Sequence, residues 1–500
     1  MIDILWNLIG EGVVWFVAII VILVNIGAIV TLLFLERRNP QVVAGWLLLI
    51  LLVPIIGFVV YLFFGRHLYG EHIFSKKTIA DEGFAKIAQY QYKQIQEKTL
   101  RLPAEIERFD SAIALLLNLD DAAYSDNNQV DVYTHGEDKF AAFKEAIKSA
   151  EHHIHMEYYI LRADELGREI IDLLAERAAA GVEVRVLFDA VGVQKVKKEF
   201  YANLTKAGGR VAIFFPLKIP FLNTRINFRN HRKILVVDGK TGFIGGFNIG
   251  DEYLGKGPLG YWRDTHLRIH GAAVASLQTR FIMDWNYTVP DAPVVLGSHT
   301  DTDNRYYPLK ELLAPHGTSG VQIASSGPDG AGRAIYSGFV SLIGHARKSI
   351  YIHTPYFIPD ETIFTALLLA IRAGIDVRIV IPCKPDHPFV YWASYSYLGD
   401  LVRAGAKGYT YDNGFIHSKT AIIDGVASTI GTANWDIRSF KLNFETNAFV
   451  YDETFGQMMN EIMTKEMEEK CTLVTAEIYN NRPNWIKFKE GICRLVSPLL

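Results

Sequence analysis

The segment His231-Arg-Lys-Ile-Leu-Val-Val-Asp-Gly recurs later in the chain as His417-Ser-Lys-Thr-Ala-Ile-Ile-Asp-Gly, and this recurrence is the strongest indication of the fold. Each copy is followed at the same distances by a glycine and an asparagine, Gly245 and Asn248 after the first, Gly431 and Asn434 after the second. A single motif of this kind is compatible with an ordinary strand that carries surface charge. Two copies with matching tails indicate an internally duplicated chain.

The duplication extends outward from these motifs. Residues 143–160 read as a helix followed by an apolar strand, and residues 339–358 repeat that order. Residues 180–187 (Ala-Gly-Val-Glu-Val-Arg-Val-Leu) match residues 373–380 (Ala-Gly-Ile-Asp-Val-Arg-Ile-Val), each reading as a helix end before a buried strand. Strands that alternate with helices predict an α/β fold, a mixed sheet flanked by helices. We therefore expect two domains related by a pseudo-twofold axis.

One copy of the motif already brings several polar groups together. Because a strand alternates faces, His231 and Lys233 project to one side and Arg232 points away. The Asp238-Gly pair predicts a hairpin turn, and the returning strand brings Asn248 back beside the histidine and lysine. Lys and Asn side chains donate hydrogen bonds to phosphate oxygens, and an imidazole acts as nucleophile or as general acid and base near neutral pH.

The second copy supplies the same groups as His417, Lys419 and Asn434. Each copy holds half a site, so we expect the two copies to face each other across one phosphate. We interpret Asp238 and Asp424 as residues that end their strands beside the site and organise the turn, without contacting substrate.

An imidazole needs an acid that fixes its tautomer. Each half offers one acid downstream of its histidine, at matched positions: Asp264 follows His231, and Glu445 follows His417. From this placement we expect Asp264 and Glu445 to support the site, each for the histidine of its own half.

The N-terminal 65 residues differ from the rest of the chain. Two uncharged runs, read as helices over about 12–35 and 41–64, are separated by Glu36-Arg-Arg-Asn-Pro, and each is long enough to cross a bilayer. A signal peptide is excluded because no Lys or Arg precedes the first run and a second run follows it. The sequence therefore predicts a transmembrane hairpin, with Pro54 and Gly57 placed to kink its second helix. The flanking basic residues favour a cytoplasmic catalytic part.

The expected domains follow from these boundaries. They are the membrane hairpin (1–65), a charged helical connector (66–125), the first α/β domain (126–300) and the second (301–500). The last ends in an amphipathic segment with apolar residues and basic residues interleaved: Trp485, Ile486, Phe488, Ile492 and Leu495 with Lys487, Lys489 and Arg494. This segment is interpreted either as an interfacial helix or as ordinary packing.

Composition excludes several classes of protein. The formal net charge is −3, which disfavours a dedicated nucleic-acid binder. The chain has three cysteines without C-x-x-C spacing, which excludes a disulfide framework and a cysteine-based zinc site. We expect no cofactor and no metal, because no carboxylate cluster in the sequence indicates a metal site.

The paired motifs resemble the phospholipase D superfamily, whose hallmark is HxKxxxxDxxxxxxGSxN in duplicate. The chain departs from it at Gly246 and Thr432, which stand where many members have serine. Further stretches resemble bacterial cardiolipin synthases: residues 225–233 (Arg-Ile-Asn-Phe-Arg-Asn-His-Arg-Lys), 325–329 (Ser-Ser-Gly-Pro-Asp), 354–359 (Thr-Pro-Tyr-Phe-Ile-Pro) and 436–440 (Asp-Ile-Arg-Ser-Phe), with the N-terminal hairpin and the terminal Ser-Pro-Leu-Leu.

This resemblance implies a bacterial, multi-pass plasma-membrane phosphatidyltransferase that converts two phosphatidylglycerol molecules into cardiolipin and glycerol. It implies that His231 forms a phosphohistidine and that His417 acts as general acid and base. Lys233, Lys419, Asn248 and Asn434 would stabilise the phosphate oxygens. The alternatives are a phospholipase D that uses water, a transferase with another acceptor such as phosphatidylethanolamine, a membrane-tethered nuclease and an inactive lipid-binding scaffold. The sequence does not determine the oligomeric state.

Overall fold

The computed structural model describes residues 2–35, 40–61, 82–216, 228–294, 305–328 and 333–497. The chain forms two compact units, which are described separately here: an N-terminal unit that contains the helices up to residue 61, and a main body whose described part begins at residue 82.

The N-terminal unit begins with a long apolar helix. Helix α1 spans Ile2–Val30 and continues through a π-helical turn over Thr31–Leu35. Within the described residues, its segment Gly12–Phe34 is the one helix long and apolar enough to cross a membrane. The first predicted span, 12–35, is therefore confirmed as an apolar helix of spanning length.

The second predicted helix is broken. Residues Pro40–Leu52 form α2 and Pro54–Val60 form α3, with Val53 between them at φ −133° and ψ 71°. Proline has no N–H and disfavours helical geometry at the residue before it, so the break at Val53 follows from Pro54. The prediction of one continuous helix over 41–64 is wrong in this respect, and residues 62–64 lie outside the described residues. The expected kink at proline is confirmed.

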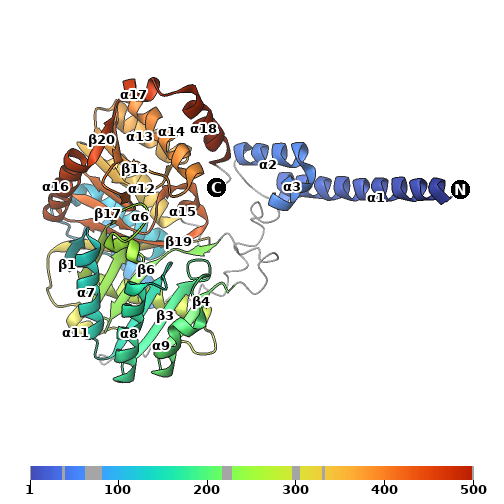
Figure 1. Cartoon of the computed structure of the whole chain (residues 1–500). Coiled ribbons are helices and arrows are strands. Elements are labelled where there is room, and N and C mark those ends of the chain that lie inside the picture. Colours follow the sequence, from blue (N-terminus) through green and yellow to red (C-terminus); the bar gives the residue numbers. More distant parts are fainter. Residues whose placement is uncertain are drawn as a thin grey trace. The chain divides into compact units, whose positions relative to one another are not determined.

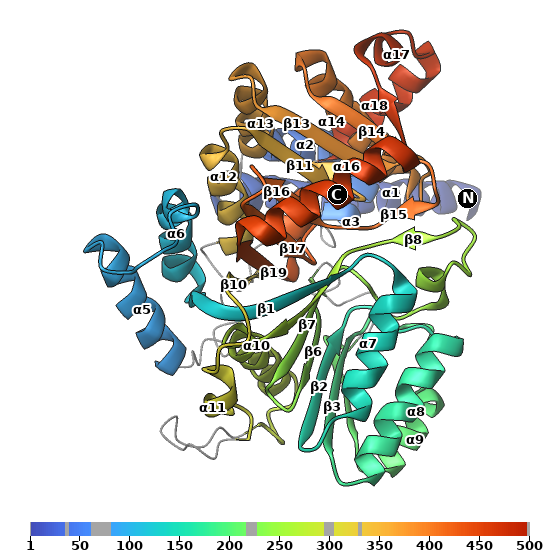
Figure 2. The same ribbon diagram turned by 90° about the vertical axis from the view of Figure 1, so that its left-hand side faces the viewer.

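The main body is built on a mixed sheet made of two equivalent halves (Figures 1 and 2). The first half runs in the spatial order β1-β9-β7-β6-β2-β3-β4. Its strands are β1 (Ser125–Tyr133), β2 (His153–Tyr158), β3 (Glu183–Asp189), β4 (Arg210–Phe214), β6 (Lys233–Val237), β7 (Thr241–Gly245) and β9 (His266–His270).

The second half repeats this order as β10-β19-β17-β16-β11-β13-β14 and adds β20 at its edge. Its strands are β10 (Ser319–Ser326), β11 (Ser349–His353), β13 (Asp376–Pro382), β14 (Lys407–Tyr411), β16 (Thr420–Ile423), β17 (Ala427–Gly431), β19 (Asn443–Tyr451) and β20 (Cys471–Val474). The two halves match strand for strand, which confirms the predicted duplication and the α/β class.

The halves join along β1 and β10, which pair antiparallel at Ser125↔Val321 and Asn128↔Ser319 with an irregular register between these pairs. The sheet therefore continues from one half into the other, and the main body forms one compact unit. The expected division into domains at residues 300 and 301 stays a prediction.

Helices cover both faces of each half of the sheet, as Figure 2 shows for the first. On β2, Ile154 and Met156 face the cluster that contains α7 and α8, whereas His153 and His155 contact Gln278 of α10. This alternation is the pattern expected of a strand buried on both faces. The principal covering helices are α7 (Gly136–Lys148), α8 (Glu165–Ala179), α10 (Ala273–Thr288), α12 (Ala334–His345), α13 (Glu361–Arg372), α14 (Pro388–Ala404) and α16 (Glu453–Lys470).

The described part of the predicted connector is helical, as expected, and it belongs to the second half. Helices α5 (Glu82–Gln96) and α6 (Asp110–Asp120) precede β1. Phe109, Ile113 and Leu116 are buried in the same apolar cluster as Phe339 and Phe449. These helices therefore form part of the layer that covers the second half.

Candidate active site

The two motifs meet because each half lends a short strand to the other. The segment before each histidine pairs in parallel with the opposite half: β5 (Arg229–Asn230) with the start of β19, and β15 (Phe415–Ile416) with β8 (Trp262–Arg263). The backbone N–H of His231 then donates to the carbonyl of Phe444 at 2.9 Å, and that of His417 donates to the carbonyl of Arg263 at 2.7 Å. Each histidine is thus fixed by backbone hydrogen bonds to the half that does not contain it.

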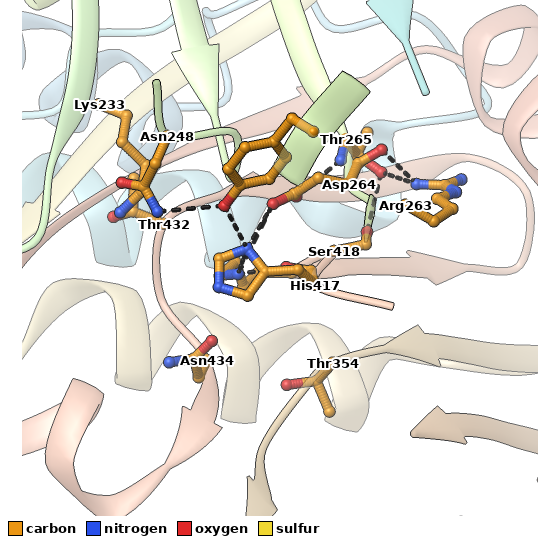
Figure 3. Close-up of polar contacts among 12 residues, drawn as sticks. Lys233, Asn248, Arg263, Asp264, Thr265, Thr354, His417, Ser418, Thr432 and Asn434 are labelled. Atoms are coloured by element: carbon orange, nitrogen blue, oxygen red, sulfur yellow. Dashed lines mark hydrogen bonds and ion pairs between the residues drawn. The ribbon is translucent and has the colours of Figure 1, made fainter. Parts of the chain in front are cut away.

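This exchange determines which acid meets which histidine. Nδ1 of His231 lies 2.9 and 3.1 Å from the two carboxylate oxygens of Glu445. Nδ1 of His417 lies 2.6 Å from Oδ2 of Asp264 (Figure 3). Both predicted acids therefore contact a motif histidine, but each contacts the one from the opposite half. The expected pairing within each half is wrong, because β5 and β15 carry the histidines across the boundary.

The two lysines complete this buried cluster. Nζ of Lys233 donates to the carbonyl of His231 at 2.7 Å. Nζ of Lys419 lies 2.8 Å from Nδ1 of His417 and also donates to the carbonyl of that residue. His231 and His417 are 8% and 7% exposed, and both lysines are buried. The structure thus places the histidine and the lysine of each motif side by side in a buried environment, and the expectation that the two motifs face one phosphate stays a prediction.

Burial controls the charge of these four groups. It lowers the pKa of His231 to about 4, against the opposing effect of Glu445, and it lowers the pKa of His417 to about 4 with the help of the Lys419 charge. Burial also lowers the pKa of Lys233 to about 7 and that of Lys419 to about 8. Both imidazoles are therefore neutral near pH 7, and the two ammonium groups are close to titration.

Asn248 reaches the opposite histidine through a tyrosine. Its Nδ2 donates to the hydroxyl of Tyr253 at 3.2 Å, and this hydroxyl lies 3.2 Å from Nδ1 of His417. Sequence reasoning missed Tyr253. Comparison of the two repeats could have indicated it, because Tyr253 and Ser439 both stand five residues after the motif asparagine and both carry a hydroxyl. The hydroxyl of Ser439 accepts a hydrogen bond from the backbone N–H of Asn434 at 3.3 Å.

The departure from serine at Gly246 has a steric reason. A Cβ at this position would overlap the carboxylate of Asp264, the acid that holds His417. Thr432, the counterpart in the second copy, uses its hydroxyl on the neighbouring strand, where it donates to the carbonyl of Thr446 at 3.2 Å and accepts from its N–H at 2.9 Å. Gly246 therefore leaves room for the carboxylate of Asp264, and Thr432 holds its own segment against β19.

Asp238 and Asp424 lie at the far ends of the motif strands. Asp238 accepts backbone hydrogen bonds from the three residues 151–153 at 2.8–2.9 Å, and Asp424 accepts three from residues 347–349 at 2.7–2.9 Å. Each lies seven positions along the chain from its histidine, roughly 20 Å in an extended strand. Their carboxylates therefore hold the backbone that leads into β2 and β11, and their expected place beside the site is wrong. The interpretation that they organise the hairpin turn stays a prediction.

Two buried arginines hold the backbone on which the acids stand. Arg232 donates to the hydroxyl of Thr446 at 2.9 Å and to the carbonyl of Glu445 at 3.3 Å, and it pairs with Asp284 of α10. Its side chain thus points away from Lys233, as predicted, and it links α10 of the first half to β19 of the second.

Arg263 does the same at the equivalent place in the other half of the site. It donates to the carbonyl of Asp264 at 2.6 Å and to the hydroxyl of Thr265 at 2.5 Å, and it pairs with Glu466 of α16 at 2.7 Å. Arg232 and Arg263 come from different positions of the repeat, so alignment of the two copies did not predict that their guanidinium groups are equivalent.

Comparison with known proteins identifies the family. A family model described as "Cardiolipin synthase, PLD-like domain" matches residues 143–285 and 339–467, one match in each half, and a "Phospholipase_D-nuclease N-terminal" model matches residues 13–66. The chain is 43% identical to the major cardiolipin synthase ClsA of Bacillus subtilis (strain 168), over 96% of this chain and 98% of that protein. It is also 43% identical to a cardiolipin synthase of Listeria innocua, over 98% of this chain and 100% of that protein.

Among solved structures, the main body is similar to the phosphatidylserine synthase of Haemophilus influenzae Rd KW20. The TM-score is 0.59 at 18% identity, and the match covers 79% of this chain and 100% of that one. At this identity the likeness supports the fold alone. Because both halves match the family model and the relatives align over nearly their whole length, the chain belongs to the cardiolipin synthase family of PLD-like proteins.

Proposed function

We propose that the chain transfers a phosphatidyl group from one phosphatidylglycerol to the glycerol hydroxyl of another, which gives cardiolipin and free glycerol. The observation that carries this proposal is the buried pair of histidines, each held through Nδ1 by a carboxylate of the opposite half. With Nδ1 engaged in this way, Nε2 is the reacting nitrogen of both rings. Two opposed imidazoles suit a two-step exchange at one phosphorus.

In the first step, Nε2 of His231 attacks the phosphorus of the first lipid. The bond from phosphorus to the glycerol oxygen breaks, and His417 gives that oxygen a proton, so free glycerol leaves and a phosphohistidine remains. In the second step, His417 takes the proton from a glycerol hydroxyl of the second lipid. This oxygen bonds to phosphorus, the bond to His231 breaks and cardiolipin is released. His417 is thus the general acid in the first step and the general base in the second.

The charges around the site suit these roles. With a pKa of about 4, His231 is neutral near pH 7 and available as a nucleophile. Entry of a phosphodiester anion favours the protonated form of His417, because a nearby negative charge raises the pKa of an imidazole. Lys233, Lys419, Asn248 and Asn434 are the proposed donors to the phosphate oxygens, on which charge develops in the transition state. Asp264 and Glu445 are proposed as positioning residues for the two rings.

The two histidines are not equivalent. The Tyr253 hydroxyl lies 3.2 Å from Nδ1 of His417, and the second copy has serine at the matching position. The extra polar contact suits a ring that must accept and release protons in both steps. We therefore assign the nucleophile to His231 and the proton transfers to His417.

The membrane supplies the substrate and limits the competing reaction. The apolar helix Gly12–Phe34 is compatible with an anchor that keeps the main body at a lipid surface. Exclusion of water from the buried site favours transfer to a lipid hydroxyl over hydrolysis of the phosphohistidine. We propose a bacterial plasma-membrane location, with more than one crossing and with the main body on the cytoplasmic side. Phosphatidylglycerol is the proposed partner, and a nucleic-acid substrate is disfavoured by the net charge of −3.

The test is lipid analysis after purified protein is incubated with phosphatidylglycerol vesicles, without nucleotide or metal. Cardiolipin with an equal amount of glycerol supports the proposal. Phosphatidic acid and glycerol without cardiolipin would make water the acceptor and the protein a hydrolase. Absence of any product would contradict phosphatidylglycerol as sole substrate. The matched control is the His231→Ala, His417→Ala double variant, which should form no cardiolipin.

A further inference from the structure

Helix α18 (Asn484–Val496) has two faces of different character. Toward the body it places Glu490, Cys493 and Arg494, of which the first two are buried. Away from the body it places a stripe of large apolar side chains: Trp485, Phe488, Ile492 and Leu495, which are between 42% and 77% exposed. This spacing of three, four and three residues puts the stripe along one side of a helix. The predicted amphipathic segment is thus a helix whose apolar side faces away from the protein.

The inner face is fastened to the body by charged groups. Arg482 forms two hydrogen bonds to the carboxylate of Glu490, at 2.6 and 2.7 Å, and the Tyr479 hydroxyl donates to the same carboxylate at 3.2 Å. Arg494 pairs with Asp400 of α14. These contacts fix the rotation of α18 about its axis, so the outward direction of its apolar stripe is determined by the fold.

The helix stands close to the proposed site. Cys493 packs in a small apolar cluster with Ile358 and Ala393. Ile358 belongs to β12 (Phe357–Ile358), which pairs with β18 (Trp435–Asp436), and β18 directly follows Asn434. One layer of side chains and one short strand pair therefore connect the base of α18 to a proposed phosphate donor.

The charge beside the stripe favours an anionic surface. Lys487 is exposed, and Nζ of Lys489 lies 5.3 Å from the ring centre of Trp485. The acid of the helix, Glu490, is buried against Arg482, so its charge is directed inward. An apolar stripe flanked by aromatic and basic side chains is the composition of helices that lie in the headgroup region of a bilayer.

We propose that α18 is a membrane-docking surface: it lies flat in the interface of an anionic bilayer, with its apolar stripe in the lipid, and thereby holds the part of the body that carries Asn434 near the membrane. The occupant of this surface is the bilayer itself, because the chain carries an apolar helix of spanning length and the basic residues complement anionic headgroups. Docking of the body is separate from the proposed reaction and requires no turnover.

The experiment places an environment-sensitive fluorophore on α18 of the full chain in vesicles that contain phosphatidylglycerol. Ile492→Cys carries the label, in a background with Cys383→Ser and Cys471→Ser. The matched control is Leu313→Cys, which replaces another exposed apolar residue, beside α11 (Leu309–Leu312) at the far end of the body from α18 (Figures 1 and 2). Nitroxide lipids labelled near the headgroup should quench position 492 at least about twofold more than position 313.

Equal, weak quenching at the two positions would overturn the proposal. A nitroxide can also be attached to position 492 of a second protein copy. If this nitroxide quenches the fluorophore and nitroxide lipids do not, the proposal is overturned and the stripe is assigned to self-association. These outcomes are independent of the reaction, because the signal requires no turnover. A failure of the lipid-product assay would therefore be distinguishable from a failure of this one.

Activity gives a second measurement. Phe488→Ser with Ile492→Ser should lower kcat/KM on vesicles about tenfold, because loss of about 1.4 kcal/mol of docking energy changes an equilibrium tenfold. The same variant should stay within about twofold of the parent on monomeric short-chain phosphatidylglycerol, which requires no docking. An equal loss on both substrates would indicate a structural role and contradict docking, as would no loss on either. Leu313→Ser is the control that should change neither rate.

Discussion

At the scale of single residues, the roles of the two histidines depend on which acid contacts each ring. The types of residue were predictable from the two motifs, and so was the presence of one acid downstream of each. The crosswise pairing of His231 with Glu445 and His417 with Asp264 was not predictable, because β5 and β15, which cause it, contain two residues each. Segments of this length carry no periodic signal in a sequence.

The crosswise pairing makes a prediction with a lipid analogue whose leaving group is nitrophenolate. Nitrophenolate departs without a proton, so its release depends on the nucleophile His231 far more than on the acid His417. Glu445→Gln should therefore slow its release by about 10²–10⁴-fold, whereas Asp264→Asn should have a much smaller effect. On phosphatidylglycerol both variants should be strongly impaired. The measurement is the absorbance of released nitrophenolate, and the opposite ranking would restore pairing within each half.

The lysines predict the pH dependence. Burial lowers the pKa of Lys233 to about 7 and that of Lys419 to about 8, and the phosphate requires their charged forms. As pH rises through 7–8 these charges are lost, so kcat/KM should fall on the alkaline side. As pH falls toward 4, His231 becomes protonated and the rate should fall again. Lys233→Arg should move the alkaline limb to higher pH, because arginine stays charged. An unmoved limb in this variant would contradict the assignment.

At the scale of elements, the repeat predicted the order of strands well and the details of their ends poorly. The identical spacing of the motifs fixed the hairpins β6–β7 and β16–β17, because an Asp-Gly turn sets the register of a two-stranded unit. The remote position of Asp238 and Asp424 follows from the same spacing, since each stands at the turn and the histidine stands at the other end of the strand. In the second apolar segment a single residue had more effect than the overall pattern, because Pro54 interrupts a helix that the apolar composition favours.

Asp424 should therefore contribute to stability rather than to catalysis. It accepts three backbone hydrogen bonds and pairs with Arg108 at 2.6 Å, which lowers its pKa even though burial acts in the opposite direction. Asp424→Ala should reduce the free energy of unfolding by about 2–3 kcal/mol, because several buried donors lose their acceptor. A carboxyl with a lowered pKa stabilises the protein above its ordinary pKa of about 4 and loses this effect in more acidic solution. Thermal unfolding followed as a function of pH measures the loss of stability and its pH dependence. The kcat/KM of the folded variant should stay within about threefold of the parent.

At the scale of the whole molecule, the two halves form one site because they are joined by exchanged strands and by buried guanidinium groups. Arg232 and Arg263 each link a helix of one half to the backbone segment of the other half that carries an acid of the site. Alignment of the repeats predicted the pseudo-twofold arrangement of the sheet. It did not reveal these links, because the two arginines occupy different positions of the repeat.

The carboxylates near Arg232 give a prediction about this junction. Burial, reinforced by the charge of Asp284, raises the pKa of Glu157 well above its ordinary value, which favours the protonated form of this carboxyl. Glu157→Gln should therefore change the free energy of unfolding by less than about 1 kcal/mol. Asp284→Asn removes the charge that faces Arg232 and should cost about 3–5 kcal/mol, with loss of activity. Chemical denaturation of the two variants measures this difference, and equal effects would indicate that Glu157 carries the charge.

In the proposed mechanism, one site shared by both halves works through a covalent bond to His231. The most direct measurement uses the nitrophenyl lipid with the His417→Ala variant, followed by rapid quenching and mass spectrometry of the protein. We expect a burst of about one nitrophenolate per protein, because a phosphohistidine forms and then persists in the absence of the base. We also expect a phosphatidyl adduct on the peptide that contains His231. A burst in His231→Ala with the adduct on His417 would reverse the two roles, and turnover without an adduct on either histidine would contradict the covalent mechanism.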